Sequence, residues 1–253
     1  MTAEHIDDYP DAFEADRRLV YSWDYLLAQL STPLTGPPIE LHLVRHAQSV
    51  ANARGLIAGQ SDAGLTLRGY VQSLVLGLRL PQHYDFACVS CLGRASRTLQ
   101  IADIVRIRMG SRLSIHSDPR LNERDLGDLE GKPRRRIEAY ALGDLTYAPS
   151  HGESYLDLSR RLLSFLVDLR RDVQYKSRII IATHIGPMRL FAGIIQGLDD
   201  PSSVLALKFA NARAYNYILS DLRWPAFISK EVLLGRSRDK VGIAERTSYY
   251  SEV

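Results

Sequence analysis

Three short, mostly apolar runs restrict the fold of this chain more than any other feature. They cover residues 41–44, 86–89 and 179–182. Runs of this length that do not alternate with polar residues are typical of parallel strands buried on both faces. Apolar side chains recur at helical spacing over residues 71–78, 101–105, 158–169 and 190–195. Strands that alternate with helices predict an α/β fold: a three-layer α/β/α sandwich with helices on both faces of a mainly parallel sheet.

Two later runs suggest a different local structure. Residues 204–209 and 214–219 are rich in apolar side chains, and only the four residues from Ala210 to Arg213 separate them. Two such runs joined by a short connection are typical of a β-hairpin. We therefore expect a hairpin at the edge of the sheet.

Charge is distributed unevenly along the chain. Residues 1–38 contain seven acidic residues and two arginines, a net charge of −5. The 253-residue chain carries +3, so residues 39–253 carry +8. A chain of this length fits one large α/β domain. We expect an acidic N-terminal extension and linker over residues 1–38, one central domain over 39–220 and a C-terminal extension over 221–253.

Within the N-terminal extension, apolar residues from Leu19 to Leu30 are spaced loosely for a helix with one apolar side. Pro33, Pro37 and Pro38 then end the pattern, because proline breaks a helix. We expect this helix to pack against the central domain. A partner-binding helix and a lid over the substrate are the alternatives.

Composition and motifs also argue against several classes of protein. Apolar runs fall far short of the roughly 20 residues of a membrane-spanning helix, and the acidic N-terminus lacks the regions of a signal peptide. We expect a cytoplasmic protein with no membrane contact. Basic residues are not interleaved with aromatic ones as in a nucleic-acid-binding module. Cys88 and Cys91 lack the second pair that a structural zinc site needs, so we expect both to fill a buried strand.

The first buried run leads directly into Arg45 and His46, and Asn52 follows six residues after the histidine. Ligands of open α/β sheets bind beyond the carboxyl ends of the strands. A guanidinium and an imidazole at such an end suit an anionic, phosphorylated substrate, because arginine offers phosphate oxygens a planar fork of donors.

Five segments together resemble the signatures of the histidine phosphatase superfamily (branch 1), also called the phosphoglycerate mutase-like family. Arg45-His46-Ala47 resembles its Arg-His-Gly motif. Residues 59–72 are similar to its Gly-x-x-Asp-x-x-Leu-Thr-x-x-Gly-x-x-Gln, and residues 90–98 to its Ser-x-Leu-x-Arg-Ala-x-x-Thr. Residues 121–131 resemble the segment with the catalytic acid, and residues 182–187 resemble the second histidine motif. The resemblance covers about residues 39–219, so the central domain is expected to be catalytic.

The resemblance implies a role for each matched residue. His46 is expected to be the nucleophile that accepts phosphate, and Glu123 the general acid and then the general base. The groups expected to hold the phosphate are Arg45, Arg94, His184 and Asn52. The positions expected to contact the rest of the substrate are Ala58, Gly59 and Ile185.

These roles agree with the chemistry of phosphoryl transfer, in which catalysis is mostly positioning and electrostatic stabilisation. Neutral His46 can attack if its other ring nitrogen donates to a backbone carbonyl. Glu123 can protonate the leaving alkoxide and then take a proton from the attacking water. No cofactor and no metal is expected, because two arginines and a histidine supply the positive charge.

Four positions depart from the family pattern. Ala47 replaces the usual glycine, and Gln48 stands where mutases usually have glutamate. Ala58 lacks the hydroxyl or thiol that mutases often have there, and Ile185 replaces a glycine after the second histidine. We expect all four to preserve catalysis and the last three to alter specificity.

Hydrolysis and mutase chemistry are the closest alternatives. Only 60 residues separate Glu123 from His184, short for the insertion with which mutases enclose their substrate. The sequence therefore favours a phosphatase acting on a phosphorylated small molecule. A silent relative that only binds a phosphorylated ligand or protein is a third reading, and a homodimer joined at a sheet edge is plausible. The basic cluster, Lys132, Arg134, Arg135 and Arg136, either faces water or contacts a second anionic group.

Overall fold

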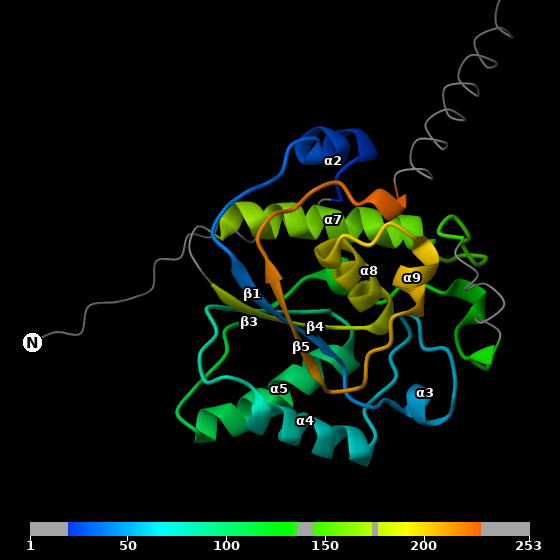
Figure 1. Ribbon diagram of the computed structural model, residues 1–253. Coiled ribbons are helices and arrows are strands. Elements are labelled where there is room, and N and C mark those ends of the chain that lie inside the picture. The colour runs from blue at the N-terminus through cyan, green and yellow to red at the C-terminus, as the bar shows by residue number, and fades with distance from the viewer. Residues whose placement is uncertain (1–19, 136–143, 174–176, 229–253) are drawn as a thin grey trace, which may run out of the picture.

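The computed structural model describes residues 20–135, 144–173 and 177–228, and these form an α/β fold as predicted. Its sheet has the strand order β3-β2-β4-β1-β5 (Figure 1). The strands are β1 (Ile39–Arg45), β2 (Phe86–Val89), β3 (Ile115–Ser117), β4 (Arg178–Thr183) and β5 (Ala214–Leu219). Neighbouring strands are parallel except for β5, which pairs with β1 in the antiparallel sense. All three buried runs are strands, and the sheet is mainly parallel.

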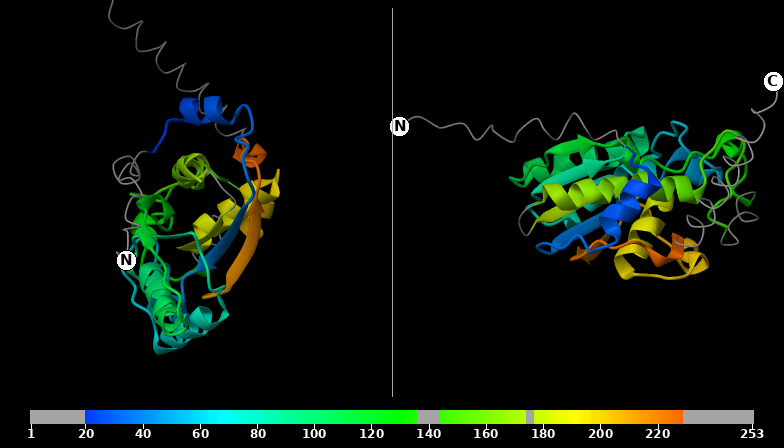
Figure 2. Two further views of the ribbon diagram at one scale, coloured as in Figure 1. Left: turned by 90° about the vertical axis from the view of Figure 1, so that its left-hand side faces the viewer. Right: turned by 90° about the horizontal axis from the view of Figure 1, so that it is seen from above.

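Helices cover both faces of the sheet. They are α2 (Trp23–Leu30), α3 (Val50–Ala53), α4 (Leu67–Arg79), α5 (Gly93–Arg108), α7 (Tyr155–Asp172), α8 (Ile185–Gln196) and α9 (Pro201–Ala206). Helices α4 and α5 lie on one face, and α7 and α8 lie on the other (Figures 1 and 2). Strand β1 contributes to both apolar cores: Leu41 and Leu43 pack towards α7 and α8, and Val44 packs towards α4 and α5. The four predicted helical segments are all helices.

The predicted hairpin over residues 204–219 is wrong in its first half. Residues 201–206 form helix α9, because the Asp200 side chain accepts from the backbone N–H of Ser203 and Pro201 occupies the first turn. Only Ala214–Leu219 is a strand, at the edge of the sheet beside β1.

The expectation for the two cysteines is correct for one of them. Cys88 is buried in β2, whereas Cys91 is exposed. The reason is that β2 ends at Val89, so Cys91 lies in the loop beyond the strand.

The N-terminal helix begins later than expected, at Trp23, where the Ser22 side chain caps it. It packs against α7, and its Leu26 and Leu30 belong to the same apolar core as Phe227 and Ile228. Segments that precede and follow the predicted central domain in the sequence therefore share one apolar core. Within the described residues, no helix is long and apolar enough to cross a membrane.

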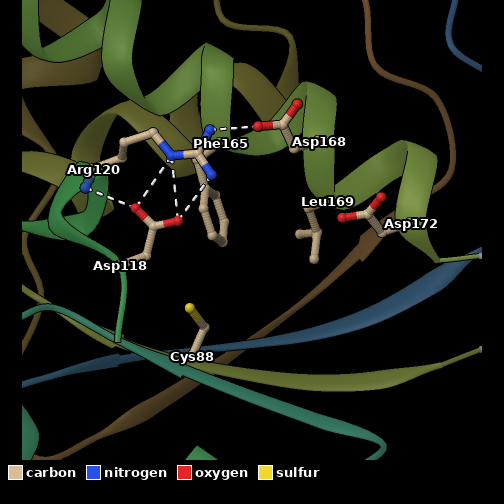
Figure 3. A pocket seen from close by; sticks show the side chains of 7 residues that line it. All are labelled: Cys88, Asp118, Arg120, Phe165, Asp168, Leu169 and Asp172. Atoms are coloured by element: carbon tan, nitrogen blue, oxygen red, sulfur yellow. Dashed lines mark hydrogen bonds and ion pairs between the residues drawn. The ribbon is translucent and has the colours of Figure 1, made fainter. Parts of the chain in front are cut away.

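A buried ion-pair cluster fastens α7 to the end of β3 (Figure 3). Arg120 bonds Asp118 at 2.8 Å and Asp168 of α7 at 2.5 Å. Tyr21, just before α2, donates its hydroxyl to Asp168 at 2.7 Å. The adjoining cavity beside Cys88 has about 10 Å³, which is too small for an organic ligand, so we assign this cluster a structural role.

Candidate active site

The carboxyl ends of the parallel strands converge on a cavity of about 420 Å³. Eight of the nine predicted site residues line it: Arg45, His46, Asn52, Ala58, Gly59, Arg94, Glu123 and Ile185. The ninth, His184, lies directly behind, with its ring centroid 5.1 Å from that of His46. The fold therefore brings together residues that are up to 140 positions apart in the sequence.

His46 follows β1 and is almost completely buried. Its Nδ1 lies 2.7 Å from the carbonyl oxygen of Ala47, and because a carbonyl only accepts, Nδ1 carries the proton. Nε2 then holds the free lone pair, as the sequence argument required. Burial and the positive charges of Arg94 and Arg45 hold the pKa of His46 well below its usual range, so the ring is neutral near pH 7 and can act as a nucleophile.

A buried arginine, Arg94, and a half-buried one, Arg45, flank this histidine. Arg94, in the first turn of α5, donates to the carbonyl oxygens of Ser61 at 2.8 Å and Gly59 at 2.5 Å. Arg45 donates to the carbonyl of Phe209 at 2.7 Å, and burial together with Arg134 lowers its pKa to about 10. Neither guanidinium has an ion-pair partner among the described salt bridges, so both charges are available to an anion.

His184 precedes α8 and takes its orientation from a hydrogen-bond relay. Asn122 Oδ1 accepts from the backbone N–H of Cys91 and from the hydroxyl of Ser90, both at 2.9 Å. The Ser90 oxygen must therefore accept from Nε2–H of His184, 2.7 Å away. The buried Nδ1 of His184 has no hydrogen-bond partner. Once protonated, this nitrogen can donate to a phosphate oxygen.

His184 is held neutral, because burial and the charge of Arg94 lower its pKa well below the usual range. A bound phosphate would bring negative charge next to the ring and favour the imidazolium. Asn52 faces the same cavity. Its Oδ1 accepts from Asn211 at 3.3 Å, so the donor end of its amide is the end available to a ligand.

Glu123 lies in the loop after the short helix Pro119–Leu121 and is almost completely buried. Its Oε1 accepts from the backbone N–H of Arg124 at 2.9 Å and of Gly186 at 3.2 Å. Arg161 of α7 donates to its backbone carbonyl at 2.9 Å, and Gln60 donates to the same oxygen at 3.1 Å. Side chain and backbone are thus both fixed at the cavity wall.

The motif over residues 59–72 supports the loop that follows the nucleophile. Gln72 accepts from the backbone N–H of Gln48 at 2.9 Å, and Thr66 caps α4. A Cβ on Gly69 would lie 2.3 Å from the carbonyl oxygen of Gln48, so only glycine lets α4 approach this loop so closely. Gly59, the first residue of the motif, lines the cavity, whereas Thr66, Gly69 and Gln72 support the loop that follows His46.

Several cavity residues were not predicted from the sequence. They are Leu56, Ile57, Arg124, Leu126, Tyr155, Gly186, Arg189, Lys208 and Phe209. Arg134 also lines the cavity, Lys132 and Arg135 are exposed outside it, and Arg136 lies outside the described residues. The sequence could have pointed to Arg124 and Arg189, because each is close in sequence to a recognised motif residue. Lys208 and Phe209 come from a segment interpreted as a strand, and no local pattern pointed to them.

Four cations therefore stand around the cavity in addition to Arg45 and Arg94. The Arg124 guanidinium lies 4.2 Å above the Tyr155 ring, and Arg189 reaches the Tyr155 hydroxyl at 3.4 Å. Arg134 and Lys208 are exposed at the rim. Among the residues that the structure describes, Glu123 is the sole acidic one that lines the cavity, so the site is suited to a ligand with more than one anionic group.

Comparisons with known proteins agree on one family. The model of the histidine phosphatase superfamily (branch 1) matches residues 41–224. A 2,3-bisphosphoglycerate-dependent phosphoglycerate mutase of Mesorhizobium japonicum is 32% identical over 77% of this chain and 98% of its own. The solved structure of mycobacterial glucosyl-3-phosphoglycerate phosphatase in complex with VO3 is 28% identical, with a TM-score of 0.55 over 70% of this chain and 90% of that one. A putative α-ribazole-5'-P phosphatase of Escherichia coli shares the fold, with 24% identity and a TM-score of 0.60 over 74% of this chain and 97% of that one.

Proposed function

The chain belongs to the histidine phosphatase superfamily, and we propose that it is a metal-independent phosphomonoesterase that forms a phosphohistidine intermediate on His46. In this proposal Nε2 of His46 attacks phosphorus while Arg45, Arg94 and His184 neutralise the equatorial oxygens. Glu123 protonates the leaving alkoxide. It then takes a proton from the water that attacks the phosphohistidine, which releases phosphate and restores neutral His46.

The observation that carries this proposal is the hydrogen bond from Nδ1–H of His46 to the carbonyl of Ala47. It fixes the tautomer that a nucleophilic imidazole needs. A buried histidine with a purely structural role would use both ring nitrogens, whereas His46 lines a cavity that five arginines and Glu123 also line. A silent binding module has no need of a buried acid in the wall of the same cavity.

The test is hydrolysis of p-nitrophenyl phosphate in the presence of EDTA. We expect turnover by the full chain and a loss of roughly 10³-fold or more in His46→Ala, because the covalent path is removed. The matched control is His83→Ala, since His83 is an exposed histidine that does not line the cavity. No turnover by the full chain, or full turnover by His46→Ala, contradicts the proposal.

We further propose that the natural substrate carries a second anionic group beside its phosphate. Arg124 is 5% exposed and has no carboxylate partner among the described ion pairs, and a buried guanidinium without a counter-charge is costly unless a ligand supplies one. The names of two relatives support this, because phosphoglycerate bears a carboxylate next to its phosphate.

Matched substrates test this second anion. We expect 3-phosphoglycerate to be hydrolysed with a higher kcat/KM than glycerol 3-phosphate, and Arg189→Gln to reduce that preference without reducing the turnover of p-nitrophenyl phosphate. Equal kcat/KM values for the two substrates contradict the second anionic group but leave phosphatase activity intact. Appearance of 2-phosphoglycerate instead of free phosphate identifies the alternative, a mutase, which the similarity to phosphoglycerate mutases supports.

A further inference from the structure

The outward face of α4 carries an apolar stripe. Its members are Leu67, Val71, Leu74 and Leu78, which are 83%, 54%, 42% and 61% exposed. The opposite side of the helix, with Ser73 and Leu76, is buried. A helix on the surface of a soluble domain usually turns charged and polar residues outward. This helix instead has apolar side chains on both sides, so its outer face is suited to a partner surface.

Helix α5, which packs beside α4 (Figure 1), enlarges this apolar surface. The described residues include eleven exposed large hydrophobic side chains, and eight of them belong to α4, α5 or the residue that ends α5. Their exposed fractions together equal about four complete side chains. A standard protein interface buries about 800 Å² on each partner, with an apolar core inside a polar rim, and these side chains are enough to form such a core.

The spacing of the stripe identifies the partner. The intervals from Leu67 to Leu78 are four, three and four residues, so the pattern reads the same in both directions. We propose that the stripe is the interface of a homodimer in which α4 packs antiparallel against α4 of a second copy. A two-fold axis between Val71 and Leu74 then places each Leu67 against a Leu78 and each Val71 against a Leu74, as an isologous interface requires.

The charge beside the stripe provides a way to distinguish a second copy of this chain from an anionic partner. The exposed residues of α4 and α5 include no acidic side chain, and Arg68 and Arg79 lie along the edge of the stripe. In the dimer these arginines approach their counterparts and repel, so added salt strengthens the association by screening them. Salt would weaken binding to an acidic partner or an anionic lipid surface instead.

The first experiment measures the oligomeric state of the full chain by sedimentation. We expect a dimer at micromolar concentration, a Kd that falls between 50 and 500 mM NaCl, and a monomer for Leu74→Glu with unchanged hydrolysis of p-nitrophenyl phosphate. The matched control is Ile218→Glu, because Ile218 is 58% exposed on the edge strand β5, where a dimer joined at the sheet edge would form. A monomeric full chain, or a dimer lost in Ile218→Glu and kept in Leu74→Glu, overturns the proposal.

The second experiment tests the antiparallel register in a Cys91→Ser background. We expect a disulfide-linked dimer for the double variant Leu67→Cys, Leu78→Cys after mild oxidation. Leu67→Cys alone should stay unlinked, since the two copies of this residue lie about 16 Å apart along the helix axes at 1.5 Å per residue. Equal cross-linking of the single variant indicates a parallel arrangement and overturns the register.

Discussion

At the scale of single residues, the site depends on two histidines that the fold holds neutral. Burial and Arg94 lower the pKa of both His46 and His184, whereas the unfolded chain titrates near the ordinary value of about 6.5. Below that pH the unfolded chain binds protons at these two histidines and the folded chain does not. The free energy of unfolding therefore falls as the pH falls. The stability contributed by the neutral rings is therefore complete above about pH 6.5 and is lost on acidification.

This gives a first prediction, measured by urea unfolding between pH 5 and 7. Each histidine should contribute a loss of about 1 kcal/mol or more per pH unit below 6.5. His184→Asn should reduce the slope, because the unfolded variant no longer gains a proton at this position. An equal slope in His184→Asn and the parent chain contradicts the burial of a neutral ring.

A second prediction concerns Asn122, which positions His184 through Ser90. Asn122→Ala frees the Ser90 hydroxyl, so the ring loses its fixed tautomer. We expect a roughly tenfold rise in the inhibition constant for inorganic phosphate, the effect of one hydrogen bond. Asn122→Asp keeps both acceptor bonds and should restore most of the affinity. Equal losses in the two variants would mean that Asn122 only stabilises the loop.

At the scale of elements, the close approach of α4 to the loop after β1 links packing to catalysis. Gly69→Ala would place a Cβ 2.3 Å from the Gln48 carbonyl, and Gly77→Ala would place one 2.4 Å from the Ala102 carbonyl. We expect both variants to lose about 1–3 kcal/mol of stability. Only Gly69→Ala should also lower kcat, because it moves the loop beside His46. Equal kcat values in Gly69→Ala and Gly77→Ala contradict the role of α4 in positioning the loop beside His46.

The ion-pair cluster of Figure 3 joins α7 to the end of β3, and Tyr21, in the segment before α2, donates to its Asp168. Arg120→Met should destabilise the fold by about 3 kcal/mol, because two carboxylates are left without their counter-charge. Tyr21→Phe removes one hydrogen bond and should cost about 1 kcal/mol. Thermal unfolding compares the two, and a smaller loss in Arg120→Met than in Tyr21→Phe contradicts this account.

At the scale of the whole molecule, the features predicted correctly from the sequence are those that a local sequence pattern encodes. The buried strands, the four long helices and the residues beyond the strand ends follow from periodicity and from family motifs. The segment over residues 204–209 was misread because its apolar content resembles a strand, while the Asp200–Pro201 cap starts a helix. Strand β3 has three residues, too few for a periodic signal. Lys208 and Phe209 reach the cavity through tertiary packing, which no local pattern records.

The central claim is that phosphate is transferred to Nε2 of His46, since Nδ1 is committed to the Ala47 carbonyl. The most direct measurement is mass spectrometry and ³¹P NMR of Glu123→Gln enzyme quenched in alkali during turnover of p-nitrophenyl phosphate. This substrate leaves without a general acid, while loss of the general base slows hydrolysis of the intermediate. The account predicts acid-labile phosphate on His46, attached at Nε2. Phosphate at Nδ1, on another residue, or on no residue at all while turnover proceeds would contradict it.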